Sequence, residues 1–180
     1  MATHFILLDR DGVLNEDSDA YIKSPDEWQP IPGSMEALAL LNQAGYHVVV
    51  ITNQSGLARG LFTNKTLNQI HAKMHRMAGE QGGYIEKIYY CPHGPDDGCN
   101  CRKPAAGLLL QFAREYGLGL TDVPFVGDSI RDIEAALNAG ASPILVRTGK
   151  GQKTLQQHPN LNIPIFDNLY DAAKNIISRQ

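Results

Sequence analysis

The stretch Phe5-Ile6-Leu7-Leu8-Asp9-Arg10-Asp11-Gly12 says most about the fold of this chain. Four consecutive apolar residues ahead of a glycine turn predict a buried parallel β-strand. In extended backbone, residues two apart point the same way, so the carboxylates of Asp9 and Asp11 converge at the carboxyl end of that strand. Two carboxylates this close need a cation between them or a proton on one of them. The pair indicates metal-assisted chemistry, with a solvated acidic turn as the alternative.

Outside this stretch, apolar β-rich runs alternate with helical patterns. This alternation predicts an α/β, doubly wound, Rossmann-like fold with a mainly parallel sheet and helices on both faces. We expect a single domain over residues 1–180, because no repeat or low-complexity linker interrupts the pattern. Residues 148–164 are expected to form a loop. The expected strands cover residues 5–8, 47–51, 85–90, 124–126 and 143–146, and the expected helices cover 34–44, a segment capped by Thr63, 106–116, 130–139 and 169–177.

Composition narrows the class of protein. The formal net charge is −3, with acidic and basic residues interspersed, which argues against sequence-independent nucleic-acid binding. No stretch approaches the apolar length of a membrane span, and the first residues lack the pattern of a signal peptide. We therefore expect a cytoplasmic protein with no membrane or nucleic-acid partner, and a monomer by default.

Three further segments carry polar residues that could bind a ligand: the loop after the second predicted strand, the end of the fourth predicted strand and the end of the cysteine loop. The second strand runs into Thr52-Asn53-Gln54-Ser55-Gly56, whose hydroxyl and N–H groups suit an anion. Asp128 follows the fourth strand and supplies the oxygen ligand that Mg²⁺ prefers, while Lys103 can neutralise a phosphate. Each feature has a structural alternative: a polar turn, a helix N-cap and a solvent-facing lysine, respectively.

All three cysteines lie in one short loop. Cys91 and His93 form one pair, Cys99 and Cys101 another, and three cysteines with one histidine are a recurrent ligand set for structural zinc. Free thiols or a strained bridge between Cys99 and Cys101 are the alternatives. The loop is rich in Gly, Pro and Asp, so a zinc ion would substitute for a core.

Two other patterns carry less weight. His71 and His75 are spaced like a helical metal pair but lack the glutamate of a zinc protease, which favours a polar helix face. Gly149-Lys150-Gly151 lacks the glycine spacing and the Ser or Thr of a phosphate-binding loop, so we reject that interpretation.

In this order, Asp9-x-Asp11, Thr52-Asn53, Lys103 and Gly127-Asp128-x-x-x-Asp132 resemble the four motifs of the haloacid dehalogenase-like hydrolase superfamily. The resemblance implies that Asp9 forms an aspartyl-phosphate and that Asp11 is the acid/base. It also implies that Thr52, the Asn53 backbone and Lys103 stabilise the phosphoryl oxygens. Mg²⁺ would be held by Asp9, the Asp11 carbonyl and Asp128, with Asp132 orienting the site.

The cysteine loop is similar to that of a superfamily branch acting on small phosphorylated metabolites. The runs at residues 53–60, 91–95 and 146–151 resemble those of one member of this branch. This resemblance implies removal of the 7-phosphate of a heptose 1,7-bisphosphate in the synthesis of bacterial surface sugars. Histidinol phosphate or another small sugar phosphate is the alternative substrate, and a zinc-stabilised binding module is the non-enzyme alternative. No insertion is long enough for a separate cap domain. The residues expected to meet substrate are Asp17, Asp19, Tyr21, Asn53, Gln54, Ser55, Arg59, Arg102 and Ser129.

Overall fold

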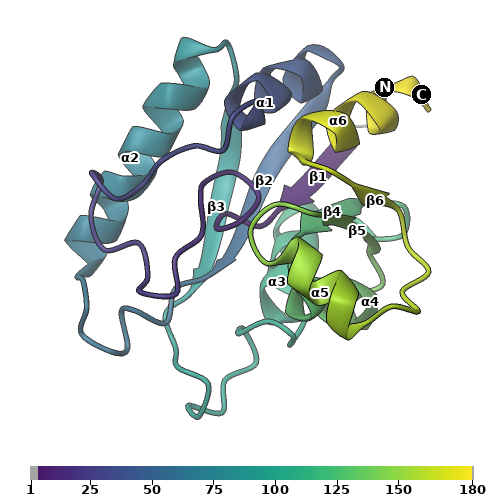
Figure 1. Ribbon diagram of the computed structural model, residues 1–180. Coiled ribbons are helices and arrows are strands. Elements are labelled where there is room, and N and C mark those ends of the chain that lie inside the picture. The colour runs from purple at the N-terminus through teal and green to yellow at the C-terminus, as the bar shows by residue number, and fades with distance from the viewer. Residues whose placement is uncertain (1–3, 180) are drawn as a thin grey trace.

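Six parallel strands form one open sheet in the order β3-β2-β1-β4-β5-β6 (Figure 1). The structure is a computed structural model that describes residues 4–179, so the signal-peptide expectation for residues 1–3 lies outside the described residues. The predicted doubly wound α/β fold is confirmed. The strands are β1 His4–Leu8, β2 Tyr46–Asn53, β3 Ile85–Cys91, β4 Pro124–Gly127, β5 Ser142–Val146 and β6 Ile165–Phe166.

Helices cover both faces of the sheet because its strands are apolar on both sides. Ile6, Leu8 and Val48 pack in one core with α1, α2 and α6, whereas Phe5 and Leu7 pack in a second core with α3 and α4. This alternation follows the two-residue period of a strand. The helices are α1 Ser34–Gln43, α2 Asn64–Glu80, α3 Gly107–Tyr116, α4 Ile130–Ala139, α5 Gly151–Gln157 and α6 Leu169–Ser178.

Local signals set the ends of several helices. The hydroxyl of Thr63 accepts a hydrogen bond from the Thr66 N–H at the start of α2, as predicted. Gly117 and Gly140 end α3 and α4 with φ of 63° and 79°, the left-handed conformation that glycine adopts without strain. These punctuating residues explain why the predicted and observed ends of both helices agree closely.

The predicted loop over residues 148–164 is wrong, because it contains α5 at Gly151–Gln157 and leads into β6. The helix has no strong apolar period. Instead, Thr154 is buried and its hydroxyl donates to the Asp128 carbonyl at 2.9 Å. A contact with a distant segment therefore stabilises a helix that the local pattern does not predict.

The strand order places a topological switch between β1 and β4. From β1 the chain runs through β2 to β3 on one side of the sheet, and from β4 it runs through β5 to β6 on the other. Ligands of open α/β sheets bind at the carboxyl ends of strands at such a point. Within residues 4–179, no helix is both long and apolar enough to cross a membrane.

Candidate active site

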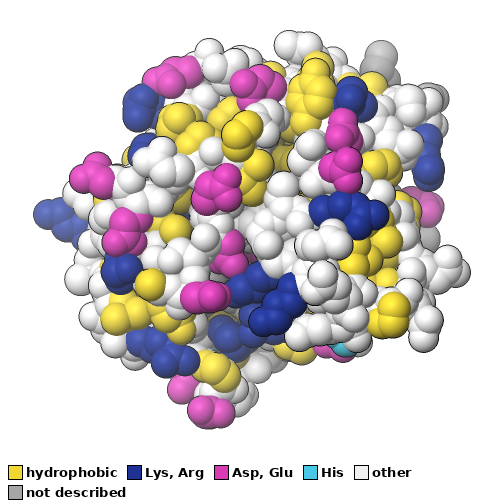
Figure 2. Space-filling model, viewed as in Figure 1, with side chains coloured by type: hydrophobic (Ala, Val, Ile, Leu, Met, Phe, Trp, Pro, Cys, Tyr) yellow, Lys and Arg dark blue, Asp and Glu magenta, His cyan; other side chains and the backbone are white. Residues whose placement is uncertain are grey.

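A cleft of about 310 Å³ opens at the carboxyl ends of β1, β2 and β4. Asp9 and Asp128, which directly follow β1 and β4, lie at its floor on either side of the switch point. Figure 2 shows acidic and basic side chains gathered together near the middle of the viewed face. The cleft is lined by Asp9, Asp11, Asp17, Ser18, Asp19, Tyr21, Ile22, Asn53, Gln54, Ser55, Arg59, Pro95, Arg102, Lys103, Asp128, Ser129, Arg131, Asp132 and Lys150.

A buried lysine ties the floor of the cleft together. Lys103 is only 2% exposed, and its Nζ lies 2.9 Å from Oδ1 of Asp9 and 2.7 Å from Oδ1 of Asp132. The same ammonium donates to the Ile51 carbonyl at 2.9 Å. Burial alone would lower the pKa of Lys103, but the charges of Asp132 and Asp9 raise it above its ordinary value. Lys103 is therefore a fixed positive charge beside Asp9.

One lysine does not balance the carboxylates gathered here. Burial, followed by the charge of Asp132, raises the pKa of Asp9 to about 8 and that of Asp128 to about 9. One carboxylate oxygen from each of Asp9, Asp128 and Asp132 lies within 4.8 Å of the others. The raised pKa values mean that these carboxyl groups ionise more readily when a further cation is present. Mg²⁺ is a cation that prefers such oxygen ligands.

Two glycines make room for Asp128. A Cβ on Gly12 would lie 2.0 Å from Oδ2 of Asp128, and one on Gly149 would lie 2.3 Å from the same oxygen. Both glycines have positive φ, and the Lys150 N–H donates to that oxygen at 2.8 Å. The backbone after β1 and β5 thus surrounds one oxygen of Asp128 closely enough to exclude any larger residue.

Asp11 is held in a single orientation by side chains around it. Its Oδ1 accepts from Nε and Nη2 of Arg10 at 3.1 and 2.8 Å and from Nδ2 of Asn15 at 2.9 Å, while its Oδ2 accepts from Nε2 of Gln54 at 3.1 Å. Burial would raise the pKa of Asp11, but Arg10, Asn15 and Gln54 lower it below its ordinary value. With Oδ1 taken by three donors, Oδ2 is the oxygen left to exchange a proton in the cleft.

The loop after β2 contributes unequally. Gln54 and Ser55 line the cleft, and Asn53 exchanges two hydrogen bonds with the Lys103 backbone, at 3.0 and 3.1 Å. Thr52 is fully buried and its hydroxyl accepts from Nε2 of Gln54 at 2.9 Å. Of the four residues expected to be catalytic, Thr52 alone is not among the residues that line the cleft, and it lies behind Gln54.

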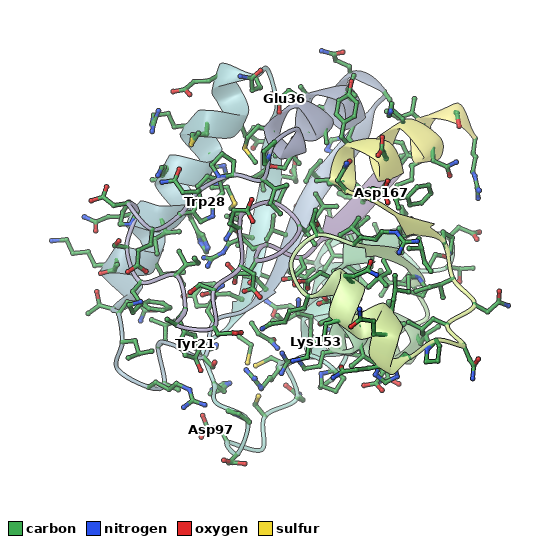
Figure 3. All side chains as sticks on the ribbon, viewed as in Figure 1. Tyr21, Trp28, Glu36, Asp97, Lys153 and Asp167 are labelled. Carbon is green, nitrogen blue, oxygen red and sulfur yellow. The ribbon has the colours of Figure 1, made fainter. Side chains whose placement is uncertain are left out.

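The remaining substrate-binding expectations gather at the mouth of the cleft. Figure 3 shows Tyr21, from the loop after β1, in the lower part of the view, toward the same end of the strands as Asp97 in the cysteine loop. The Arg59 guanidinium lies 5.7 Å from the centre of the Tyr21 ring. Asp17, Asp19, Arg102 and Ser129 also line the cleft, so all nine expected residues are brought together there.

Lys150 and Arg131 also line the cleft. The local sequence argues against a phosphate-binding loop at Lys150 and predicts no role for either residue. The Lys150 ammonium lies 3.3 Å from Oδ2 of Asp17 and 3.8 Å from Oδ1 of Asp19. The position of Lys150 just beyond the carboxyl end of β5 was the available signal, because that edge of a parallel sheet binds ligands. Arg131 carried no such signal, since it is one of several charges on α4.

The cysteine loop brings its four expected ligands together. Donor atoms of Cys91, His93, Cys99 and Cys101 lie within 4.8 Å of one another, and the cysteines are not bridged. Tetrahedral zinc with Zn–S bonds of about 2.3 Å separates its sulfur ligands by about 3.8 Å. The Sγ atoms of Cys91 and Cys99 lie 3.6 Å apart, near that value, whereas those of Cys91 and Cys101 are closer, at 2.8 Å. The donor set and its clustering fit structural zinc, and the loop projects from the ligand-binding edge of the sheet (Figure 1).

The expectation that His71 lies on a polar helix face is wrong. His71 is 7% exposed and its Nε2 lies 3.2 Å from Nη1 of Arg10, whereas His75 is exposed. The helix α2 turns His71 toward the strand-end loop because Leu67, Ile70 and Met74 bury the same side of the helix.

Comparison with known proteins agrees with this geometry. The family described as haloacid dehalogenase-like hydrolase matches residues 6–77, and one described as "HAD-hyrolase-like" matches residues 100–172. A D-glycero-beta-D-manno-heptose-1,7-bisphosphate 7-phosphatase of Bordetella bronchiseptica is 60% identical over 84% of this chain and 85% of its own. The phosphatase of the same name from Pseudomonas putida is 54% identical over 96% of this chain and 98% of its own.

A solved structure extends the likeness to three dimensions. The crystal structure of D,D-heptose 1.7-bisphosphate phosphatase from B. bronchiseptica, complexed with magnesium and phosphate, matches with a TM-score of 0.96 at 52% identity. The match covers 98% of this chain and 99% of that one. On its motifs, its fold and these relatives, the chain belongs to the haloacid dehalogenase-like hydrolase family, in the group of the heptose-bisphosphate phosphatases.

Proposed function

We propose that this protein is a Mg²⁺-dependent phosphatase that removes the 7-phosphate of D-glycero-D-manno-heptose 1,7-bisphosphate through an aspartyl-phosphate intermediate. The observation that carries the proposal is the meeting of Asp9, Asp128 and Lys103 at the switch point of the sheet. The names of the relatives supply the substrate. The reaction belongs to the synthesis of ADP-heptose for the lipopolysaccharide core. In this proposal residues 1–180 form one domain, and the protein is a cytoplasmic monomer.

In this mechanism Asp9 is the nucleophile. A carboxylate oxygen attacks the phosphorus, and the bond between phosphorus and the 7-oxygen of the sugar breaks. Lys103 lies beside Asp9 and neutralises the phosphoryl oxygens, with further donors from Asn53 and Ser55. Asp9, the Asp11 carbonyl and Asp128 would hold Mg²⁺, which supplies further charge neutralisation when bound.

Asp11 would move the protons in both halves of the reaction. Its Oδ2 protonates the departing sugar oxygen, then accepts a proton from the water that hydrolyses the aspartyl-phosphate. The lowered pKa of Asp11 keeps its carboxyl group ionised, so that it can accept a proton from water. Its role as the acid requires a higher pKa, and the negative charge of a bound phosphate shifts it in that direction.

The mouth of the cleft suits a polar ligand with a second phosphate. Arg59, Arg102, Arg131 and Lys150 line it together with acidic and hydroxyl side chains that can bind sugar hydroxyls. A guanidinium fork matches the geometry of phosphate. Zinc, held by the cysteine loop, would order the backbone that leads into Arg102 and Lys103, and so connect a structural site to catalysis.

The test is phosphate release with Mg²⁺ from the heptose bisphosphate and from histidinol phosphate, compared as kcat/KM. We expect a larger value for the heptose, and a larger value for histidinol phosphate would overturn the substrate assignment. Asp9→Asn should abolish release while the far-ultraviolet circular dichroism spectrum is unchanged. Turnover by a folded Asp9→Asn variant would refute the covalent mechanism. A zinc-stabilised binding module with no turnover predicts no release by the wild type.

A further inference from the structure

The side chain of Arg10 is fully buried next to the catalytic centre, and the proposed mechanism does not use it. Its backbone N–H donates to Oδ1 of Asp9 at 2.8 Å, and its Nε and Nη2 donate to Oδ1 of Asp11. Arg10 therefore touches both proposed reacting carboxylates from behind the cleft. A guanidinium removed from water in this way needs partners for its remaining N–H groups.

His71 supplies one such partner from α2. Its Nε2 lies 3.2 Å from Nη1 of Arg10. Arginine has only donors, so Nε2 is the acceptor, and the ring is neutral with its proton on Nδ1. Burial and the charge of Arg10 lower the pKa of His71 to about 3, in agreement with a neutral ring. The Tyr90 ring packs against His71 at 6.4 Å between centroids and restrains its orientation.

We propose that His71 is a positioning residue for phosphoryl transfer: by accepting from Nη1 it fixes the guanidinium of Arg10, which in turn holds Oδ1 of Asp11 and presents Oδ2 to the leaving oxygen. The inference rests on the phosphatase function proposed above. His71 touches no substrate and acts through Arg10. The chain of contacts runs from a helix on one face of the sheet to the acid/base at the end of β1.

The geometry explains why one acceptor matters. Arg10 meets only one oxygen of Asp11, through Nε and Nη2, so Nη1 is the guanidinium nitrogen that a contact outside Asp11 can fix. Without His71, this buried donor lacks its partner, and the guanidinium turns to find another. Asp11 then loses its two charged donors and is held only by the amides of Asn15 and Gln54, which fix its orientation less firmly. Asp9 and Lys103 keep their positions.

The experiment compares two substrates in His71→Leu. A sugar phosphate has a poor leaving group that needs protonation, whereas p-nitrophenyl phosphate has a good one that does not. We expect kcat/KM with Mg²⁺ to fall by about 10- to 100-fold for heptose bisphosphate, which is part of the rate enhancement that a general acid provides. For p-nitrophenyl phosphate we expect a fall of less than about threefold, because its leaving group needs no proton. His71→Gln retains an acceptor and should restore the wild-type ratio of the two kcat/KM values.

His75→Leu is the matched control, because His75 lies one turn along α2, is exposed and should leave the ratio unchanged. An equal fall for both substrates, or no change in either, overturns the inference and leaves the phosphatase proposal standing. Absence of phosphate release by the wild type instead overturns the phosphatase proposal. If His71→Leu does not fold, His71→Asn, whose amide is too short to reach Nη1, takes its place and must show the same selective loss.

Discussion

Replacing Lys103 with methionine tests how the floor of the cleft balances its charges. Methionine keeps most of the apolar stem and removes the ammonium, which contacts Oδ1 of Asp132, Oδ1 of Asp9 and the Ile51 carbonyl between 2.7 and 2.9 Å. Removing one partner of a buried ion pair costs about 3–5 kcal/mol, because the other charge stays buried without compensation. The carboxyl group of Asp9 can take up a proton instead, which favours the lower end of that range at neutral pH.

We therefore expect Lys103→Met to lower the free energy of unfolding by about 3 kcal/mol in the absence of Mg²⁺. At a urea m-value of about 2 kcal/mol/M, the midpoint of unfolding falls by about 1.5 M. Phosphatase kcat/KM should fall by about 100-fold or more, because a charge that faces the phosphoryl oxygens is lost. Equilibrium urea unfolding at pH 7 with a chelator measures the stability, and phosphate release measures the activity.

Two companion variants separate the electrostatic effect from a general one. Lys153→Met removes an exposed lysine on α5 (Figure 3) and should leave the midpoint unchanged. Asp132→Asn, added to Lys103→Met, removes one uncompensated charge and should recover at least about 1 kcal/mol. A loss below about 1 kcal/mol in Lys103→Met, or no recovery in the double variant, would refute the reasoning.

Three further predictions follow from the metal sites. The raised pKa values of Asp9 and Asp128, about 8 and 9, mean that the metal-free folded protein retains protons that the unfolded chain loses near pH 4. The free energy of unfolding of the metal-free protein should therefore decrease as pH rises from about 4 to 9. The increase in Tm on adding Mg²⁺, measured by calorimetry, should be larger at about pH 8.5 than at about pH 5.5. A larger increase at the lower pH would contradict this prediction. Gly12→Ala should weaken Mg²⁺ affinity about tenfold or more, because the added Cβ would overlap Asp128. Gly45 has a similar positive φ but open space around it, so Gly45→Ala should lower only the Tm. Equal Mg²⁺ affinities of the two variants in calorimetric titration would oppose this prediction. Cys101→Ser should lose zinc by elemental analysis and reduce kcat/KM by about tenfold, and full activity in the zinc-free variant would exclude the structural role.

Local sequence was enough to locate most of the elements. The apolar run before Asp9 predicts β1, and glycines at 117 and 140 mark the ends of α3 and α4. These signals succeed because strand and helix periods and left-handed caps depend on neighbouring residues. The local signal fails at α5, where burial of Thr154 under Asp128 replaces an apolar period.

The candidate site divides in the same way. Asp9, Asp128 and Lys103 are predictable because they follow strands or precede a helix at one edge of a parallel sheet. The local motif argues against a phosphate-binding loop at Lys150, whereas the place of this residue in the cleft depends on contacts with Asp17 and Asp128, which lie far away in the sequence. The surroundings of His71 could not be predicted either, because they depend on which face of α2 packs against the sheet.

The sequence by itself therefore determined the α/β architecture and the Cys/His cluster of Cys91, His93, Cys99 and Cys101, since both follow from patterns and spacing along the chain. The four motifs were found through their resemblance to a family. Only the tertiary structure decided that Gln54 reaches Oδ2 of Asp11, why Gly12 is needed beside Asp128, and that His71 contacts Arg10. These are contacts between segments brought together by packing, and packing two layers of helices on a sheet sets distances that no local period encodes.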